Sequence, residues 1–344
     1  MINLVRRHRA RRSLTIGTGV AACVAAVAAL SMAQAQAPAQ TGDNIATRII
    51  TLGTGGGPIA RAKRSESATL VQVGSHSYLI DAGAGVSHQL AASGFAPSDV
   101  HHIFLTHLHF DHVAGLAPLL GFGWANGNKK VVDIYGPPGT AQFLSDGLKY
   151  LSIPEGIFRA QMAPSPSISD LSKAHDVDIT KPTVIYQDEQ VRVTAVENSH
   201  FITIPVDRRP LGAKRAYSYR FDTPDRSIVI TGDTGPSDAV VQLAKGADVL
   251  ISEVLDWDDA TSIAMQKKLG VTAEQFKATT DHMLEEHLSP AQVGKLAAQA
   301  GVKMVILSHV GMGGDSETDM RHYTQGVRSA YSGPVVIARD GDEF

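Results

Sequence analysis

Residues 106–112 constrain the fold of this chain more than any other stretch. They read Thr-His-Leu-His-Phe-Asp-His and place three imidazoles and one carboxylate within six consecutive positions. The β-branched and aromatic residues 100–105 before them predict a strand, and the apolar residues 113–120 after them predict a helix. Neutral imidazoles and carboxylates are ligands of catalytic zinc, and a turn between strand and helix can aim them toward two ions. The sequence therefore predicts a metal site at the end of a strand.

The N-terminal region has the composition of an export signal. Residues 1–12 carry five arginines, residues 14–30 are small and apolar, and Ala33-Gln34-Ala35 fits a signal cleavage site. We expect residues 1–35 to be removed as an export signal, of either the twin-arginine or the general secretory type. Residues 36–44 would then be a short flexible N-terminus, and the mature protein would be periplasmic or secreted. A transmembrane anchor over residues 14–30 and a lipoprotein cleavage site at Cys23 are the alternatives.

The mature chain would be free of cysteine and acidic. Cys23 is the only cysteine, so neither a disulfide nor a thiolate ligand would remain after cleavage. The formal net charge of −3 becomes −8 once the five arginines of residues 1–35, and no acid, are removed. Because nucleic-acid phosphates need a basic surface, we expect no nucleic-acid partner. We also expect no membrane contact in the mature form, and a homo-oligomer remains open.

Strand-like and helix-like segments alternate over residues 45–344, which predicts one α/β domain. The glycine run at residues 53–57 lacks the lysine of a phosphate-binding loop, so we expect a tight turn that passes under the metal ligands. Residues 121–128 form a predicted glycine-rich loop, in which Phe122 and Trp124 either hold a flat substrate or pack on the domain. Residues 152–181 contain several prolines and are expected to be irregular.

Three predicted strands in the second half of the chain each lead to a candidate ligand. Residues 191–196 precede His200, residues 227–231 precede Asp233, and residues 304–307 precede His309. Strand ends converge on one edge of a sheet, so ligands that are distant in sequence can meet there.

These motifs resemble the metallo-β-lactamase superfamily, whose fold is an αββα sandwich of a single domain. Within it, residues 52–58, residues 106–112, Gly232-Asp233-Thr234 and the pair His287 and His309 are most similar to the branch of ribonuclease Z and the zinc-dependent arylsulfatases. The resemblance implies two zinc ions per chain, one held by His107, His109 and His200, the other held by Asp111, His112 and His309, with Asp233 bridging them. Two zinc ions about 3.5 to 4 Å apart would share a hydroxide as the nucleophile.

The resemblance also assigns catalytic roles. Asp111 would orient the attacking water, and His287 would donate a proton to the leaving group without binding metal. His282 is the rival donor. Glu253 would supply a supporting hydrogen bond, and no catalytic role is expected for the remaining candidates His101, His102 and His322.

The residues of the candidate site favour some activities of this superfamily over others. A β-lactamase is disfavoured, because lactamase branches lack a bridging carboxylate and several use a cysteine ligand. Quorum-quenching lactonases carry a tyrosine shortly after the bridging aspartate, and here Thr234-Gly235-Pro236-Ser237 follows it. Ribonuclease Z carries a basic arm that the 33 positions from His200 to Asp233 cannot hold, and its substrates are cytoplasmic. A non-catalytic zinc protein leaves the full ligand set unexplained.

We therefore expect an exported dizinc hydrolase that acts on a small ester substrate. Arylsulfatase-like hydrolysis of a sulfate ester is the leading expectation, and hydrolysis of a phosphodiester or a lactone is the alternative.

Overall fold

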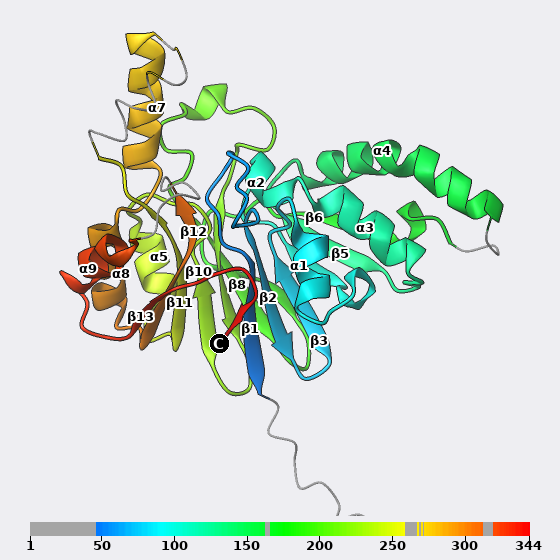
Figure 1. Ribbon diagram of the computed structural model, residues 1–344, viewed down its shortest axis with the longest axis horizontal. Coiled ribbons are helices and arrows are strands. Elements are labelled where there is room, and N and C mark those ends of the chain that lie inside the picture. The colour runs from blue at the N-terminus through cyan, green and yellow to red at the C-terminus, as the bar shows by residue number, and fades with distance from the viewer. Residues whose placement is uncertain (1–45, 162–165, 259–266, 268–269, 271, 312–318) are drawn as a thin grey trace, which may run out of the picture. The chain divides into compact units, whose positions relative to one another are not determined.

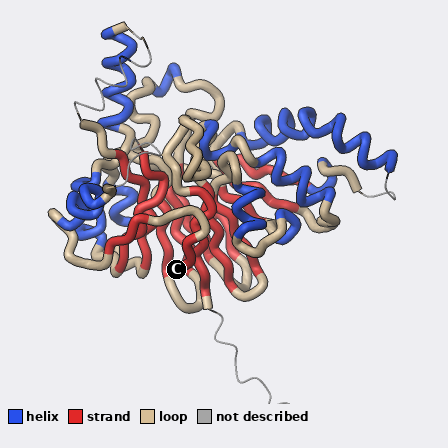
Figure 2. The backbone as a smooth tube through the Cα atoms, in the orientation of Figure 1, coloured by secondary structure: helices blue, strands red, loops and turns tan. Residues whose placement is uncertain are grey.

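Two seven-stranded mixed sheets stack face to face, and helices cover their outer faces (Figures 1 and 2). The computed structural model describes residues 46–161, 166–258, 267, 270, 272–311 and 319–344. The αββα arrangement confirms the predicted fold class. The predicted signal and flexible N-terminus, residues 1–44, lie outside the described residues, as do both alternatives for residues 14–30. No helix among the described residues is long and apolar enough to cross a membrane.

The first sheet has the strand order β14-β1-β2-β3-β4-β5-β6. β1 pairs antiparallel with β2, and β2 pairs antiparallel with β3, whereas β3 through β6 pair parallel. Its strands are β1 (Thr47–Gly53), β2 (Ala68–Val73), β3 (His76–Ile80), β4 (His102–Phe104), β5 (Val132–Gly136), β6 (Ser172–Asp176) and β14 (Asp342–Glu343).

The second sheet has the strand order β13-β12-β11-β10-β9-β8-β7. β7 through β10 pair antiparallel, and β10 through β13 pair parallel. Its strands are β7 (Thr183–Gln187), β8 (Arg192–Glu197), β9 (Tyr217–Asp222), β10 (Ser227–Ile230), β11 (Val249–Leu255), β12 (Met304–Gly311) and β13 (Val335–Ile337).

The helices lie on either side of the stacked sheets, except α7, which projects from the body above the strand ends (Figure 1). The α-helices are α1 (Val86–Ala92), α2 (Phe110–Val113), α3 (Leu116–Ala125), α4 (Thr140–Gln161), α5 (Asp238–Leu243), α7 (Ala273–Glu285), α8 (Pro290–Ala300) and α9 (Arg321–Arg328). The part of the chain that the structure describes also contains the short 3₁₀ helices η1 (Pro97–Asp99), η2 (Ser169–Leu171) and η3 (Val206–Arg208).

Three apolar layers hold these elements together. Alternate side chains of one strand enter different layers: Ile49 packs between the two sheets, whereas Ile50 packs under the helices of the first sheet. A third cluster fills the space between the second sheet and α5, α8 and α9. Because the central strands are buried on both faces, their sequences are continuous apolar runs instead of alternating ones.

The predicted glycine-rich loop at residues 121–128 is wrong, because most of it is helix. Residues 121–125 complete α3, and Trp124 is buried with its Nε1 donating to the carbonyl of Pro166. Gly121 and Gly123 serve close packing within the helix, whereas Gly127 lies in the turn that follows it, at a φ of 91°. A Cβ on Gly121 would lie 3.2 Å from Leu151, and one on Gly123 would lie 3.2 Å from the carbonyl of Pro97.

The predicted irregular segment at residues 152–181 is also wrong over much of its length. α4 continues through Pro154 to Gln161, and β6 adds a parallel strand to β5. A proline removes one backbone donor from a helix, and the exposed residues around Pro154 leave the other groups free to reach water. Residues 162–165 lie outside the described part of the chain.

Candidate metal centre

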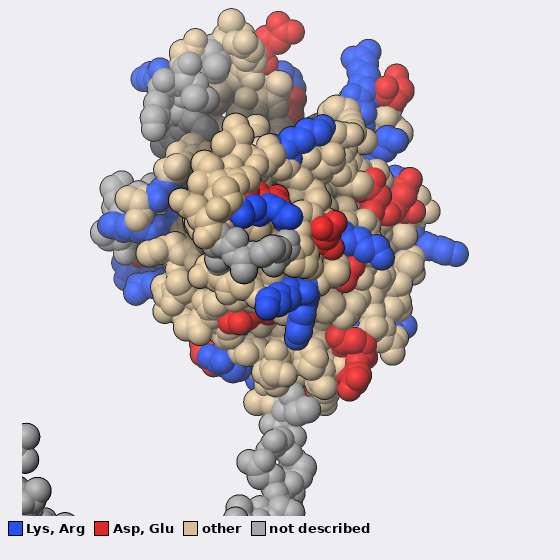
Figure 3. Space-filling view, turned by 90° about the vertical axis from the view of Figure 1, so that its right-hand side faces the viewer, with Lys and Arg blue, Asp and Glu red and all other residues tan. Residues whose placement is uncertain are grey.

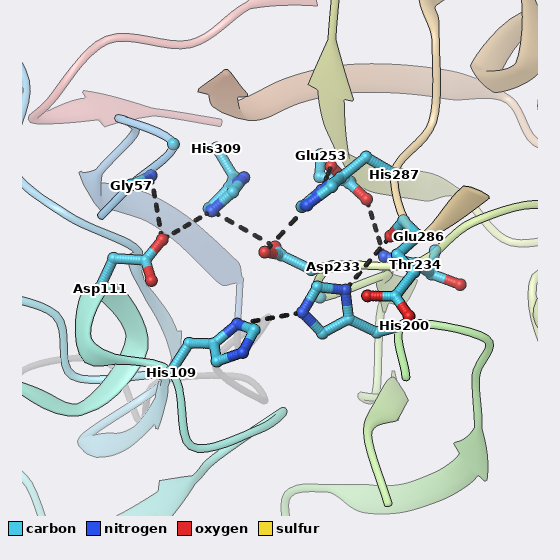
Figure 4. A network of polar contacts seen from close by, with 12 residues as sticks. Gly57, His109, Asp111, His200, Asp233, Thr234, Glu253, Glu286, His287 and His309 are labelled. Atoms are coloured by element: carbon cyan, nitrogen blue, oxygen red, sulfur yellow. Dashed lines mark hydrogen bonds and ion pairs between the residues drawn. The ribbon is translucent and has the colours of Figure 1, made fainter. Parts of the chain in front are cut away.

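Loops at one end of the two sheets bring the predicted ligands together (Figure 4). β4 ends at Phe104 and α2 begins at Phe110, so His107 and His109 lie on the turn between them. His200 follows the end of β8, and Asp233 follows the end of β10. His309 lies within β12 at a backbone φ of 43°, a strained conformation of a kind often found at functional sites.

One group of nitrogens is formed by His107, His109 and His200. Nδ1 of His109 lies 3.1 Å from Nε2 of His107 and 3.1 Å from Nε2 of His200. Burial lowers the pKa values of His107 and His200 well below the usual value, and it also lowers the pKa of His109. All three rings are therefore neutral near pH 7 and offer lone pairs, which is the form that binds zinc.

A second group is formed by Asp111, His112, Asp233 and His309. Oδ1 of Asp233 lies 3.3 Å from Nε2 of His112 and 3.3 Å from Nε2 of His309. The same Nε2 of His309 lies 3.1 Å from Oδ2 of Asp111. The other oxygen of Asp233, Oδ2, lies 3.9 Å from Nε2 of His107 in the first group. Asp233 thus stands between the two groups, as a bridging ligand would.

The charges of the second group depend on one another. Burial raises the pKa of Asp233, but His309 and His112 outweigh burial and hold its pKa well below the usual value. Burial lowers the pKa of His112, but Asp233, Asp81 and Asp111 raise it well above the usual value. Without a cation, protons on the imidazoles therefore balance the carboxylates. A metal ion would take the place of those protons.

The donor set fits divalent metal ions. In each of the two groups the ligand atoms lie within 4.8 Å of one another, and the same holds for a third, overlapping group of His200, Asp233 and His287. Among the described residues, Nε2 of His112 and Oδ1 of Asp233 are buried and have no hydrogen-bond partner. Buried polar atoms without a hydrogen bond are costly unless an ion satisfies them. Nitrogen and carboxylate oxygen without sulfur suit zinc in a hydrolytic site.

Asp81 orients His112, a predicted ligand, and the sequence did not reveal this role of Asp81. Oδ2 of Asp81 lies 2.7 Å from Nδ1 of His112, and Oδ1 accepts a hydrogen bond of 2.8 Å from the amide of Thr106. With Nδ1 engaged, Nε2 of His112 faces the second group. Asp81 closes β3 at a backbone φ of 59°. An aspartate at the end of the strand next to the metal-motif strand was the signal that could have indicated this role.

The glycine turn lies against the second group, as expected. The amide of Gly57 donates a hydrogen bond of 2.9 Å to Oδ2 of Asp111 (Figure 4). A Cβ on Gly57 would lie 2.3 Å from the Cβ of Asp111. The turn therefore needs glycine, and it fixes the carboxylate of Asp111 in place.

His287 lies beside both groups in a buried pair with Glu253. Its Nδ1 is 2.8 Å from Oε2 of Glu253 and 4.0 Å from Oδ2 of Asp233. Oε1 of Glu253 accepts a hydrogen bond of 2.7 Å from the amide of Thr234. Burial lowers the pKa of His287, but Glu253 raises it more, so that the pKa reaches about 9. Glu253 therefore makes the supporting hydrogen bond that was expected of it.

The other candidate histidines lie in different surroundings. His282 pairs with Glu286, and its ring centroid is 5.2 Å from that of His287. His102 contacts Tyr186 at 3.2 Å, and His322 lies 3.1 Å from Asp256. None of these three belongs to either ligand group.

Comparison with known proteins identifies relatives of this chain. Residues 76–310 match the family described as the beta-lactamase superfamily domain. Ribonuclease Z of Mycobacterium bovis (strain BCG / Pasteur 1173P2) is 32% identical over 267 residues, which are 76% of this chain and 85% of that protein. Ribonuclease Z of Mycobacterium sp. (strain KMS) is 30% identical over 266 residues, which are 76% of this chain and 83% of that protein.

Solved structures share the fold at lower identity. The short form of human tRNase Z has a TM-score of 0.59 and 21% identity, over 86% of this chain and 98% of that chain. Zn(2+)-bound PqqB from Methylobacterium extorquens has a TM-score of 0.59 and 15% identity, over 86% of this chain and 99% of that chain. At these identities the likeness concerns the fold alone.

The relatives contradict two expectations from the sequence. The leading expectation of an arylsulfatase-like enzyme for small esters is wrong, because the relatives at 30–32% identity are named ribonuclease Z. The expectation of no nucleic-acid partner is contradicted by the same relatives. Both errors came from the net charge of the whole chain and from the length of a single interval, and neither quantity describes the surface around the metal groups.

The match over residues 76–310 and the identity shared with ribonuclease Z over three quarters of the chain show that this protein belongs to the β-lactamase superfamily of metallo-β-lactamase-fold hydrolases.

Proposed function

We propose that this protein is a metal-dependent hydrolase that cleaves phosphodiester bonds in RNA. The observation that supports this most is the pair of adjoining ligand groups with Asp233 between them. Such an arrangement is suited to holding two ions against a phosphoryl group. Identity of 32% to a protein named ribonuclease Z supports RNA as the source of that group.

His107, His109 and His200 would hold one zinc ion, and Asp111, His112 and His309 would hold the second, with Asp233 between them. Bound zinc would supply Lewis-acid stabilisation of the phosphoryl group and would activate a water molecule for attack.

The residues of the chain would position the water and move the proton. Asp111, fixed by the amide of Gly57, would orient the attacking water. His287, with a pKa of about 9, carries two ring protons at neutral pH. Its Nδ1 proton is directed to Glu253, so the Nε2 proton is the one available for the departing oxygen of the cleaved diester.

The net acidic charge of the chain does not oppose RNA binding. Figure 3 shows lysine and arginine side chains interspersed with acidic ones, without a continuous acidic surface on that face. The loop that follows His200, residues 201–216, carries the exposed cations Arg208 and Lys214. Contacts with phosphates depend on local cations of this kind.

Hydrolysis assays with zinc-loaded protein test this proposal. The substrates are a transfer-RNA precursor, an unstructured RNA, bis-nitrophenyl phosphate and nitrophenyl sulfate, with a His107→Ala variant as the control for contaminating nucleases. We expect cleavage of RNA and of the phosphodiester that the variant lacks. Hydrolysis of the sulfate ester with no cleavage of either RNA would contradict the proposal.

Export of the protein remains part of the proposal, because residues 1–35 carry the signal composition described above. An exported enzyme would meet RNA outside the cytoplasm, whereas a retained one would meet transfer-RNA precursors. Cell fractionation followed by N-terminal sequencing shows whether the protein is exported and cleaved or is retained in the cytoplasm. Recovery of the full-length chain from the cytosol would contradict export.

A further inference from the structure

A buried glutamate, Glu286, connects three segments around the predicted ligand His200. It is 1% exposed, and its backbone carbonyl accepts a hydrogen bond of 3.2 Å from Nδ1 of His200. Its Oε1 accepts hydrogen bonds from the amide of Thr203 at 2.7 Å and from the hydroxyl of Thr203 at 2.5 Å. Its Oε2 pairs with Nδ1 of His282 on α7. Figure 4 shows Glu286 next to His200 and Thr234.

The backbone contact fixes the orientation of His200. A carbonyl can only accept, so Nδ1 of His200 is the protonated nitrogen and Nε2 carries the lone pair. Nε2 is also the atom that lies 3.1 Å from His109 in the first ligand group. A hydrogen bond to the far nitrogen commonly orients a metal-binding histidine.

The carboxylate of Glu286 fixes two segments that border the ligands. Thr203 belongs to the loop of residues 201–216, whose Phe201 packs against His109 with ring centroids 5.5 Å apart. His282 lies in the last turn of α7, and its ring centroid is 5.7 Å from that of His200. Of the two partners of the carboxylate, His282 therefore lies next to His200. Thr203 is two residues from Phe201, which packs on His109.

The backbone around Glu286 is held on its other side as well. A Cβ on Gly235 would lie 1.9 Å from the carbonyl oxygen of Glu285, so these two backbone segments are in direct contact. Gly235 follows Asp233 and Thr234 in sequence. A buried carboxylate raises the free energy of the folded protein unless its oxygens accept hydrogen bonds. The burial of Glu286 therefore favours conformations in which Thr203 and His282 stay in contact with it.

We propose that Glu286 is a positioning residue that holds His200 toward the metal and fixes the loop of residues 201–216 and α7 as walls of the substrate site. The part that concerns substrate rests on the proposed function, whereas the part that concerns metal does not.

Three variants and one matched control test this inference. Glu286→Ala removes the carboxylate and keeps the backbone carbonyl. A change in metal binding by His200 would then report the loss of the carboxylate's contacts with Thr203 and His282. Glu286→Gln keeps one acceptor for Thr203 and loses the ion pair with His282. Thr203→Val keeps Glu286 itself and removes the hydroxyl donor. Glu285→Gln alters the exposed neighbouring glutamate as the control.

The first measurement is metal affinity by competition with a chromophoric chelator, together with the absorption spectrum of the cobalt-substituted protein. We expect Glu286→Ala to weaken the binding of one ion about 10- to 100-fold and to change the cobalt spectrum. Glu286→Gln and Thr203→Val should show smaller changes in the same direction, and Glu285→Gln should match the parent protein. If Glu286→Ala does not fold, the other two variants still carry the test. Parent-like affinity and spectra in the folded Glu286 variants would overturn the inference.

The second measurement separates this inference from the proposed function. On a phosphodiester substrate, we expect Glu286→Gln to raise KM and to lower kcat by a smaller factor. If the parent protein cleaves no phosphodiester while the variants still lose metal affinity, the proposed function fails and the metal part of the inference stands. If RNA is cleaved but the variants change neither affinity nor KM, the inference fails and the function stands.

Discussion

Nδ1 of His287 lies 2.8 Å from Oε2 of Glu253, and both side chains are buried beside Asp233. The pair holds the imidazole in one orientation. The proton on Nδ1 is shared with Glu253, and the proton on Nε2 is not. An oriented imidazolium next to two ligand groups is suited to protonating a leaving group. Measuring both the bound zinc and the reaction rate of a His287 variant can therefore distinguish a proton donor from a metal ligand.

His287→Ala should keep its bound zinc and lose about 10²- to 10⁴-fold in rate on diesters with poor leaving groups. The loss should be smaller for bis-nitrophenyl phosphate, because nitrophenolate departs without protonation. Steady-state kinetics over a series of leaving groups, with metal analysis of each sample, makes the comparison. His282→Ala is the matched variant. Zinc loss from His287→Ala would make this residue a ligand, and leaving-group dependence in His282→Ala alone would make His282 the donor.

Asp233→Ala should lose most of its activity and part of its metal. Oδ1 faces His112 and His309, while Oδ2 faces His107, so the substitution would remove the proposed bridging ligand from both groups at once. Elemental analysis after dialysis against a weak chelator gives the metal content per chain. Asp207→Ala, which alters an exposed aspartate, is the control and should keep the parent content. Two full equivalents of tightly held zinc in Asp233→Ala would contradict the bridging role.

The ligand motif could be predicted from sequence because its chemistry is local. Residues 106–112 hold four donor side chains in one turn, and the continuous apolar runs beside them determine the strands. Asp81 and Glu286 could not be found in this way. Their partners His112 and His200 lie 31 and 86 positions away in sequence, and only the packed fold brings them into contact.

The C-terminal parts of α3 and α4 were not predicted from the sequence, for a different reason. Glycine and proline usually interrupt helices, yet tertiary packing overrides propensity where a glycine permits close approach, as Gly123 does against Pro97. Substrate class was missed because net charge sums over the whole chain. Under the proposed function, recognition of RNA would depend on a few local cations, such as the exposed Arg208 and Lys214 of the loop that follows His200.

Arg208→Ala and Lys214→Ala should weaken RNA binding and leave the hydrolysis of bis-nitrophenyl phosphate nearly unchanged. Each exposed cation that neutralises a phosphate contributes about one unit to the slope of log affinity against log salt. Titration of labelled RNA at several salt concentrations measures that slope. Lys245→Ala is the control, because Lys245 precedes β11 and so lies at the opposite end of the sheet from the ligands. An unchanged slope in both variants would exclude this loop from RNA contact.

Gly57→Ala should weaken metal binding without unfolding the protein. The added methyl group would overlap the side chain of Asp111 at 2.3 Å, so either the turn or the carboxylate has to move. We expect lower affinity for one ion in chelator competition and a thermal unfolding temperature within a few degrees of the parent value. Gly156→Ala provides the control, because a Cβ on Gly156 in α4 would meet no atom within 4 Å. Parent-like metal affinity in Gly57→Ala would show that Asp111 does not need its contact with the turn.

Asp188→Asn should destabilise the fold by about 1–3 kcal/mol at neutral pH without affecting the metal ligands. Oδ2 of Asp188 accepts hydrogen bonds of 2.7 Å from the hydroxyls of Tyr78 and Tyr186, and Oδ1 accepts one of 2.8 Å from each of the amides of Gln190 and Val191. An amide in place of the carboxylate would direct hydrogens at some of these donors. Because Tyr78 belongs to β3 and Tyr186 to β7, the substitution weakens a contact between the two sheets.

The same contact has a defined pH dependence. Burial raises the pKa of Asp188, but hydrogen bonds from Tyr78 and Tyr186 outweigh it, so the pKa in the folded protein lies below the usual value. A lowered pKa stabilises the fold above the unfolded pKa of about 3.9, and this contribution is lost as the pH falls through the folded pKa. The difference in unfolding free energy between the parent and Asp188→Asn should therefore shrink below about pH 4. Denaturant unfolding across this pH range, with the exposed neighbour Glu189→Gln as control, measures it, and a difference that grows on acidification would contradict the assignment.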